Sequence, residues 1–337
     1  MPAINDFPVV RFVSAPRWRL LVSALLAAAS LVGTPALAQA YPSKAIRIIV
    51  PYTAGGASDV LARVIGNKLQ QAWGQPVVVE NKVGASGAIG TDYVAKSAPD
   101  GYTLVLSDLG TLTIGPSIYK LPFDVEKDLA PITILTSSPY LVTVHPGLPI
   151  QTLKDLIDYS KANPTKLNYA SSGMGTGPHM AGLLFATRTG LQWTYIPSKG
   201  GAQAITDVIG GQADLMFNSA FSTSAFVKTG KLRLLAVSTP KRYGAFPDTP
   251  ALAEVAPGFN AGAYQALFAR AGTPPEIVSR LNAEVVKILA MPDVKEKLQG
   301  LGADPYGSTV EGMRQFVRDD RERWAKLVKD QNIKIEQ

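Results

Sequence analysis

Short apolar runs rich in Val, Ile and Leu alternate with longer segments of mixed polar and apolar residues along this 337-residue chain. Runs of the first kind are typical of buried strands, and the longer segments are typical of helices that cover a sheet. This alternation predicts an α/β protein whose helices wrap mainly parallel sheets. The predicted strands are residues 46–52, 77–80, 102–107, 132–135, 140–144, 167–170, 193–196, 214–218, 232–238 and 264–268.

Three segments carry clear helix signals. Thr152 stands as N-cap before an acidic first turn, and Asn163-Pro164 ends that segment. A second helix is expected to start at Pro274-Pro275, because the apolar residues after it recur every three or four positions: Ile277, Leu281, Val285 and Ile288. The last segment, 310–330, mixes apolar residues with many charges, which predicts a terminal surface helix.

Two stretches are predicted to cross between lobes. Residues 128–139 are apolar and extended, and we expect them to form the first crossing. The strand at 232–238, followed by an irregular stretch at 240–250, is expected to lead the chain back to the first lobe. We therefore expect two lobes joined by crossing strands, each lobe with a mixed, mainly parallel sheet. Lobe I would comprise residues 41–139 and 239–337, and lobe II residues 140–238.

The first 40 residues have the pattern of a secretory signal peptide. Three arginines precede an apolar run at 20–32, and small residues follow at 36–40, which predicts cleavage after Ala38 or Ala40. A transmembrane anchor is the alternative. Gly33 and Pro35 interrupt the run, and it is shorter than the roughly 20 residues that a spanning helix needs.

Charge and cysteine content narrow the class of protein. The 33 Lys and Arg exceed the 26 Asp and Glu, but they are spread along the chain, so nucleic acid is not an expected partner. The chain has no cysteine, which excludes disulfides, a thiol nucleophile, a thiolate metal site and a lipid-anchored cysteine. A cysteine-free exported chain fits a bacterial periplasm.

A first candidate binding loop follows the strand at 46–52. Gly55 and Gly56 allow a ligand to approach the backbone, Thr53 and Ser58 offer hydroxyls, and the start of the next helix offers free N–H groups. This combination predicts an anion pocket. The alternative is a plain turn capped by its own Ser and Asp, and capping is the role we expect for Asp59. The candidate ligand-binding residues here are Tyr52, Thr53, Ala54, Gly55, Gly56, Ser58 and Asp59.

The same order of strand, Ser/Gly turn and helix recurs at 166–188. Its hydroxyls and glycines suit a carboxylate held by neutral donors, and its spacing fits neither a phosphate-binding Walker loop nor a dinucleotide fingerprint. His179 falls in the first helical turn, where we expect a buried structural role. The candidates in this loop are Ser171, Ser172, Gly173, Thr176 and His179.

Further candidates come from a third turn and from strand ends. Lys199 and Gly200 precede a helix, and Lys199 could add a positive charge, although a solvated lysine is the ordinary expectation. Ligands of open α/β sheets gather where strands end, which adds four polar residues: Ser107, Asp108, Asn218 and Ser219.

Signals for catalysis are few. His145 and His179 stand in no zinc-ligand spacing, and the chain has no Gly-x-Ser-x-Gly elbow. We therefore predict no enzyme activity, no catalytic residue, no metal and no cofactor. The alternative from the enzyme class is a small-ester or amide hydrolase that uses His179 with a nearby serine such as Ser171.

A series of motifs occurs in one order along nearly all of the chain after residue 40: Tyr-Pro-Ser-Lys at 41–44, Gly-Gly-x-x-Asp at 55–59, Val-Glu-Asn-Lys at 79–82, Pro-Asp-Gly-Tyr-Thr-Leu at 99–104, Tyr-Ala-Ser at 169–171, Pro-Ser-Lys-Gly at 197–200 and Gly-Gly-Gln-Ala-Asp-Leu-Met-Phe at 210–217. In these motifs the chain resembles the substrate-binding proteins of tripartite tricarboxylate transporters, the TctC or Bug family. The resemblance implies the type II periplasmic binding fold, in which two lobes close on a ligand. It also implies a monomer that delivers small carboxylates to membrane permease subunits.

In that family, backbone N–H groups, hydroxyls and ordered waters hold the ligand, which places the two binding loops of this chain at residues 52–59 and 171–179. The chain departs from the family pattern at Tyr52 in place of Phe, Ser198 in place of Tyr, Asn218 in place of Asp and the segment 263–267. Asn218 removes an acceptor charge, which disfavours a ligand that carries an amine. We predict a periplasmic protein that captures a small organic carboxylate for transport, with a ligand sensor for a membrane receptor as the alternative.

Overall fold

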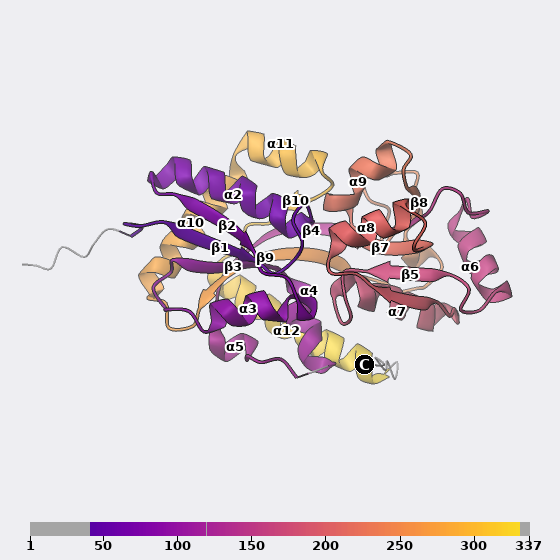
Figure 1. The fold of residues 1–337 in the computed structure, drawn as a ribbon, viewed down its shortest axis with the longest axis horizontal. Coiled ribbons are helices and arrows are strands. Elements are labelled where there is room, and N and C mark those ends of the chain that lie inside the picture. Colours follow the sequence, from indigo (N-terminus) through magenta and orange to yellow (C-terminus); the bar gives the residue numbers. More distant parts are fainter. Residues whose placement is uncertain (1–40, 119, 331–337) are drawn as a thin grey trace, which may run out of the picture. The chain divides into compact units, whose positions relative to one another are not determined.

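The computed structural model describes residues 41–118 and 120–330, so the predicted signal peptide lies outside the described residues. Within these residues the chain forms a mixed α/β structure (Figure 1). Its strands are β1 (Ile46–Val50), β2 (Val77–Asn81), β3 (Thr103–Asp108), β4 (Leu129–Val144), β5 (Asn168–Ser171), β6 (Thr194–Pro197), β7 (Leu215–Ser219), β8 (Arg233–Val237), β9 (Gly262–Arg270) and β10 (Asp304–Pro305).

The strands pair in the order β2-β1-β3-β9-β4-β7-β5-β6, with β8 and β10 also paired to β4. Parallel pairing joins β1 to β2 and β3, and joins β5 to β6 and β7. The pairs formed by β4 and β9 are antiparallel. Each predicted strand therefore corresponds to a strand of the structure. The sheet is mixed, as predicted, because the two longest strands, β4 and β9, run against their neighbours.

The strand β4 joins two sections of the sheet. The sequence predicts separate strands at 132–135 and 140–144, whereas the chain stays extended through Ser137-Ser138-Pro139 as one strand. Its first part, from Leu129 to Pro139, pairs with β9, and its last part, from Tyr140 to Val144, pairs with β7 and β8. This strand is the crossing that the apolar stretch at 128–139 predicts.

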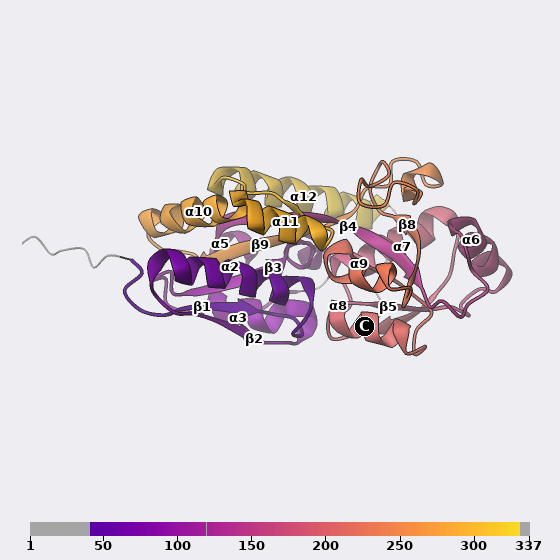
Figure 2. The same cartoon turned by 90° about the horizontal axis from the view of Figure 1, so that it is seen from above.

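Helices cover the sheet on both sides (Figures 1 and 2). They are α2 (Ala57–Trp73), α3 (Ala88–Ala95), α4 (Leu109–Ile114), α5 (Val125–Asp128), α6 (Leu153–Ala162), α7 (Gly177–Thr189), α8 (Gly201–Ile209), α9 (Ala220–Lys228), α10 (Pro275–Ala290), α11 (Pro292–Gly300) and α12 (Val310–Asp330), with 3₁₀ turns η1 (Ala85–Gly87), η2 (Gly115–Ser117) and η3 (Leu252–Glu254). In the described part of the chain, no helix combines the length and the apolar character that a membrane span requires.

The helix predictions are confirmed at their ends. Thr152 accepts a hydrogen bond from the Asp155 N–H at 3.1 Å, and the Asp155 side chain accepts one from the Thr152 N–H at 2.9 Å. This reciprocal capping box fixes the start of α6. Helix α10 begins at Pro275 and buries Leu281, Val285 and Ile288, the face that the apolar spacing predicts.

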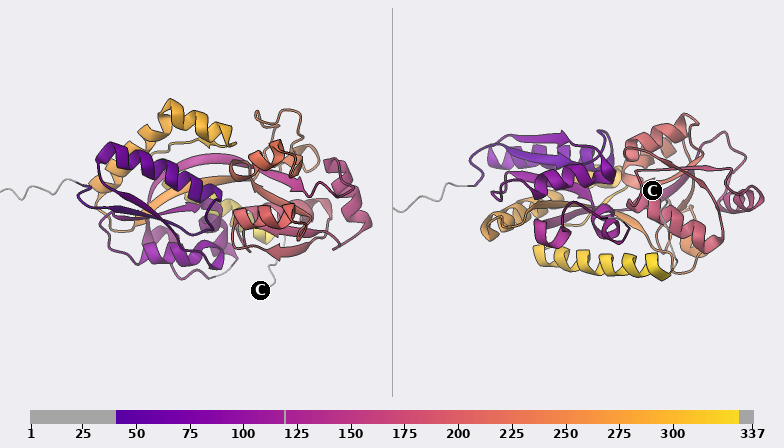
Figure 3. Two further views of the ribbon diagram at one scale, coloured as in Figure 1. Left: turned by 45° about the horizontal axis from the view of Figure 1, so that its top comes forward. Right: turned by 60° about the horizontal axis from the view of Figure 1, so that its bottom comes forward.

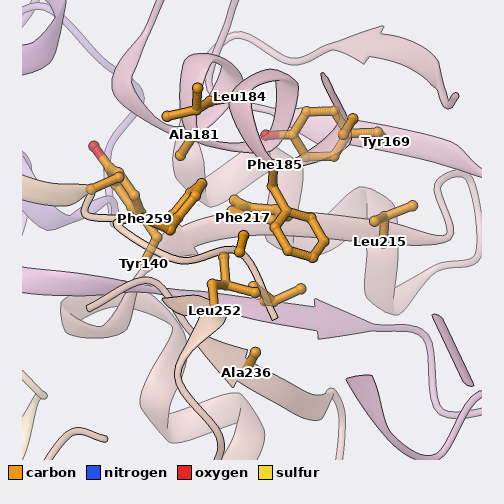
Figure 4. Close-up of a cluster of buried hydrophobic side chains, with 14 of the residues drawn as sticks. Tyr140, Tyr169, Ala181, Leu184, Phe185, Leu215, Phe217, Ala236, Leu252 and Phe259 are labelled. Carbon is orange, nitrogen blue, oxygen red and sulfur yellow. The ribbon is translucent and has the colours of Figure 1, made fainter. Parts of the chain in front are cut away.

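Two hydrophobic clusters make up most of the core. One contains aromatic residues from β4, β5, α7 and β7, among them Tyr140, Tyr169, Phe185 and Phe217 (Figure 4). The other lies around β1, β3 and β9 and includes Ile49, Val105 and Phe268. Helix α12, the long yellow helix in Figure 3, contributes to both clusters. Its Met313 and Val317 pack in the second cluster, and its Trp324 packs in the first.

The segment after β8 packs with the predicted lobe II. Leu252, Phe259 and Ala261 belong to the same cluster as Phe185 and Phe217, and the Ala261 N–H bonds to the Ser238 carbonyl at 3.2 Å. Residue 238 therefore does not mark the place where the chain leaves this cluster. We propose that lobe II extends to about residue 262, where β9 begins and crosses beside β4.

Candidate functional site

One cavity lies where several strands end and helices begin. Its volume is about 40 Å³, which is room for about three water molecules at roughly 10–15 Å³ each. Eight of the predicted ligand-binding residues line it: Tyr52, Gly56, Ser58, Asp108, Ser172, Thr176, Asn218 and Ser219. The remaining lining residues are Ala57, Thr111, Tyr140, Pro178, Gly201, Ser222 and Gln265. The two predicted loops therefore meet at one small cavity.

Three helices start at this cavity without a side-chain cap. The N-cap residues of α2 and α8 are Gly56 and Gly200, which have no side chain to offer. The N-cap of α7 is Thr176, but its hydroxyl donates to the Gly173 carbonyl at 2.7 Å instead of capping the helix. The first N–H groups of a helix need acceptors, and they carry the positive end of the helix dipole. The cavity wall therefore offers convergent donors that suit an anion.

Two other helices that begin at the cavity are capped in the ordinary way. The Asp108 side chain accepts from the Gly110 N–H at 2.9 Å at the start of α4. The Ser219 hydroxyl accepts from the Phe221 N–H at 3.2 Å at the start of α9. The starts of α4 and α9 are therefore capped by side chains, whereas the starts of α2, α7 and α8 are not. Of the uncapped helices, α2 follows the first predicted binding loop and α7 follows the second.

A chain of hydrogen bonds ties three lining side chains together. Ser58 donates its hydroxyl to the Gln265 side-chain oxygen, and the Gln265 amide nitrogen donates to Asp108 Oδ2 at 3.1 Å. Ser58 and Gln265 are buried, at 4% exposure each. The amide of Gln265 is thereby oriented from both ends, and it holds the Asp108 carboxyl in place at the end of β3.

Among the described residues, Asp108 is the only acidic or basic side chain that lines the cavity. Burial raises the pKa of its carboxyl to about 7, and the nearby Asp320 adds to this rise, while hydrogen bonds from Gly110 and Gln265 oppose it. Near neutral pH the carboxyl is therefore divided between its charged and neutral forms. No group of three or more His, Cys, Asp or Glu in the described residues could hold a metal ion.

Two tyrosines complete the polar wall. The Tyr52 hydroxyl shares hydrogen bonds with Thr111 Oγ1 at 2.6 Å and with Ser107 Oγ at 3.3 Å. Ser107 itself does not line the cavity, so its part is to fix the ring of Tyr52. Tyr140 is only 1% exposed, and it is one of the residues that line the cavity. A tyrosine hydroxyl can both donate and accept a hydrogen bond, so a ligand in the cavity can bind to it.

Asp59 does not cap α2, which corrects the expectation for it. Its carboxylate accepts from the Gly55 N–H at 3.0 Å, from Asn81 at 3.1 Å and from the Arg63 guanidinium at 2.9 Å. Burial raises its pKa, but the bonds from Arg63, Gly55 and Asn81 outweigh this and hold the pKa below its ordinary value. Asp59 therefore fixes the glycine turn from behind, and this leaves the helix start free.

Several candidates of the second loop support the loop from behind. His179 is 5% exposed, accepts from the Gly175 N–H at 3.0 Å through Nδ1 and packs against the ring of Tyr195. Burial lowers the pKa of His179 to about 4, so the ring is neutral at ordinary pH. Ser171 shares hydrogen bonds with the Gly173 carbonyl and the Tyr195 hydroxyl. None of Ser171, Gly173 and His179 lines the cavity.

The other predicted residues lie at the rim or outside. Ala54, Gly55 and Lys199 are exposed and do not line the cavity. Thr53 and Gly200 face each other across the loops, since a Cβ on Gly200 would lie 2.7 Å from Thr53 Oγ1. The absence of a side chain at Gly200 thus allows the first and third turns to meet.

Some lining residues that the predictions missed have weak signals in the sequence. Ala57, Pro178 and Gly201 lie next to predicted positions on the same turns, so they would be included if each predicted loop were extended by one or two residues. Gln265 is a polar residue inside the apolar run 263–268, and a buried polar residue in a strand is itself a signal. Tyr140 begins a predicted strand and gives no local signal.

The comparisons with known proteins agree with this geometry. The family model described as "Tripartite tricarboxylate transporter family receptor" matches residues 61–333. Protein BugT of Bordetella pertussis is 36% identical over 319 residues, which cover 94% of this chain and 98% of BugT.

Solved structures give the same result. The R. palustris protein Rpa4515, solved with adipate, is 33% identical and superposes with a TM-score of 0.85 over 87% of this chain and 99% of its own. The periplasmic binding protein BugD is 32% identical, with a TM-score of 0.82 over 88% of this chain and 100% of its own. The predicted α/β, two-lobed type II periplasmic binding fold is therefore confirmed, and the chain belongs to the tripartite tricarboxylate transporter receptor family, as the sequence motifs predict.

Proposed function

We propose that this protein is a periplasmic solute-binding protein that captures a small organic carboxylate and delivers it to the permease subunits of a tripartite transporter. The observation that carries the proposal is the meeting of three uncapped helix starts, those of α2, α7 and α8, at one cavity. No basic side chain from residues 41–118 and 120–330 lines this cavity. Carboxylate oxygens are acceptors that such donors can bind without a cation. The adipate in the Rpa4515 structure is a ligand of this class.

Capture would work through preorganised donors. Gly55, Asn81 and Arg63 hold the first turn through Asp59, and His179 holds the second through Gly175, so the helix starts need little reordering when a ligand arrives. Contacts between the turns, such as Thr53 against Gly200, close the space around the ligand and exclude water. Little of the binding free energy is then needed to order the loops, and water does not compete for the donors.

The site favours binding over hydrolysis. A serine hydrolase needs its nucleophile in hydrogen-bond reach of a base. Within the described part of the chain, Ser171 bonds to Gly173 and Tyr195, and His179 Nδ1 accepts from Gly175, so no hydrogen bond joins the two. We therefore propose transport without chemistry, in the periplasm where its relative BugD is described.

A thermal-shift panel tests the proposal. Mature protein, freed of any retained ligand as checked by mass spectrometry, is heated with succinate, malate, adipate, benzoate, aspartate and matching amides. We expect carboxylates to raise the melting temperature and their amides not to, because only a ligand that binds the folded state stabilises it. No shift with any carboxylate would overturn the proposal.

Replacing Gly56 by valine should weaken carboxylate binding by about tenfold or more, equal to about 1.4 kcal/mol. Gly56 has an ordinary φ of −74°, and an added Cβ would meet only the Thr53 carbonyl at 3.4 Å and the Ala202 N–H at 4.0 Å. The lobe should therefore fold, while the branched side chain fills space that the ligand needs. The dissociation constant is measured by titration calorimetry.

Ala54→Val is the matched control, since Ala54 is exposed on the same turn and does not line the cavity. It should bind as the unaltered protein does. Equal affinity of the two variants would remove Gly56 from the site.

A further inference from the structure

The cavity holds an acid among donors that favour an anion. Asp108 lines the same small space as the uncapped starts of α2, α7 and α8, and no basic side chain in the described residues lines it. A carboxylate ligand in this space would lie close to the Asp108 carboxyl. Two neighbouring carboxylates that are shielded from water and lack a cation cannot both stay ionised without a large cost.

The surroundings of Asp108 supply no compensating charge. Gly110 and Thr111 of α4, Gln265 of β9 and Gly177 of α7 are not titratable. The titratable groups that face it are Tyr140 on β4, Tyr52 after β1, and Asp320 on α12. The carboxylate of Asp320 bonds to Arg323 at 2.6 Å and to Thr113 at 2.6 Å, so the guanidinium beside Asp320 is already paired with that acid.

The donors around Asp108 are also too few to hold its charge beside a second anion. Oδ1 accepts from the Gly110 N–H, Oδ2 accepts from Gln265, and the Thr111 N–H also donates to this carboxyl; all three donors are neutral. The Tyr140 hydroxyl lies at the same wall, because a Cβ on Gly177 would be 2.0 Å from Tyr140 Oη and 3.5 Å from Asp108 Oδ1. A ligand oxygen at this wall could accept from Tyr140 and from a protonated Asp108 together.

We propose that Asp108 binds the ligand as a neutral carboxylic acid that donates its hydrogen bond to a ligand carboxylate oxygen, so that capture from neutral or alkaline solution takes up one proton. This inference rests on the proposed function and deepens it. The ligand class is a carboxylate without an ammonium group, since an ammonium would pair with ionised Asp108 and need no proton. Burial already raises the pKa of Asp108 to about 7 in the free protein, and a bound anion raises it further.

The test is calorimetric titration with the dicarboxylates succinate, malate and adipate at about pH 6, 8 and 9, in two buffers of different ionisation enthalpy. Because only the protonated protein binds, the association constant should fall about tenfold from pH 6 to 8 and about tenfold again to pH 9. Comparison of the two buffers should give an uptake that approaches one proton per ligand at pH 9. The ligands themselves stay ionised throughout this range.

Asp108→Asn supplies a permanent neutral donor, and asparagine keeps the N-cap of α4. Its affinity should be nearly independent of pH and should exceed that of the unaltered protein about tenfold or more at pH 9. Asp320→Asn is the control for a neighbouring acid outside the cavity, and its affinity should keep the slope with pH.

Each other outcome is informative. The inference would be overturned by an affinity that rises with pH, by a flat profile in the unaltered protein or by a retained slope in Asp108→Asn. These results leave carboxylate capture intact. Absence of binding by every carboxylate at every pH would instead overturn the proposed function, and the inference with it.

Discussion

Replacing Gly177 by alanine should lower the free energy of unfolding by about 1–3 kcal/mol, as overpacking of a tight contact does, and should disturb the cavity at the same time. A Cβ at this position would lie 2.0 Å from Tyr140 Oη, far inside contact distance. Gly177 is the first residue of α7, so relief requires either the helix start or the buried Tyr140 to move. Urea unfolding and carboxylate titration measure the two effects.

The second substitution Tyr140→Phe tests the cause. Without the hydroxyl, the nearest atom of that ring is Cζ at 3.1 Å from the added Cβ, so the clash is largely removed. The double variant should regain stability relative to Gly177→Ala, with a coupling of about 0.5–3 kcal/mol. Gly300→Ala in α11 is the control, because an added Cβ there meets nothing within 4 Å. Additive effects of the two substitutions would show that the clash is not the cause.

The turns that bear the site could be predicted because their signals are local. Gly56 and Ser58 were predicted to lie at the site because a β-branched run, two glycines and a helix start follow one another within about 15 residues. The same order of elements predicted Ser172 and Thr176. The positions of most strands followed from their apolar runs, whereas the join between the two halves of β4 and the two-residue strand β10 were missed. Ser137-Ser138-Pro139 reads as a break, yet pairing with β9 keeps it extended.

What the sequence could not supply are the contacts between distant segments. Ser58 and Gln265 are 207 positions apart, and no periodicity links them. Asp59 was predicted to cap its own helix, α2. Its carboxylate instead accepts hydrogen bonds from Asn81, 22 positions away on β2, and from the Gly55 N–H in the glycine turn. Among the described residues, the absence of a basic side chain from the cavity wall that bears Asp108 is likewise a property of the assembled cavity. Local patterns thus predict where a site is built, and the packing of distant elements decides its chemistry.

Replacing Phe185 by alanine should have the largest effect on stability, a loss of about 3–5 kcal/mol, which is usual for a large aromatic residue removed from a core. Phe185 is fully buried, and its ring lies 6.0 Å from that of Phe259 in a T-shaped pair and 6.1 Å from that of Phe217. Thermal and urea unfolding should both show the loss. Ile89→Ala is the control, because Ile89 is 54% exposed and should change the free energy of unfolding by less than about 0.5 kcal/mol.

The pair Phe185 and Phe259 also tests where lobe II ends. If residues 239–261 fold as part of lobe II, Phe259→Ala should destabilise the protein by a similar amount, and the double variant should lose less than the two single losses together, because each ring packs against the other. The aromatic pair should show a coupling of about 0.5–1.5 kcal/mol. Strictly additive losses would separate Phe259 from the core of Phe185 and return the boundary to residue 238.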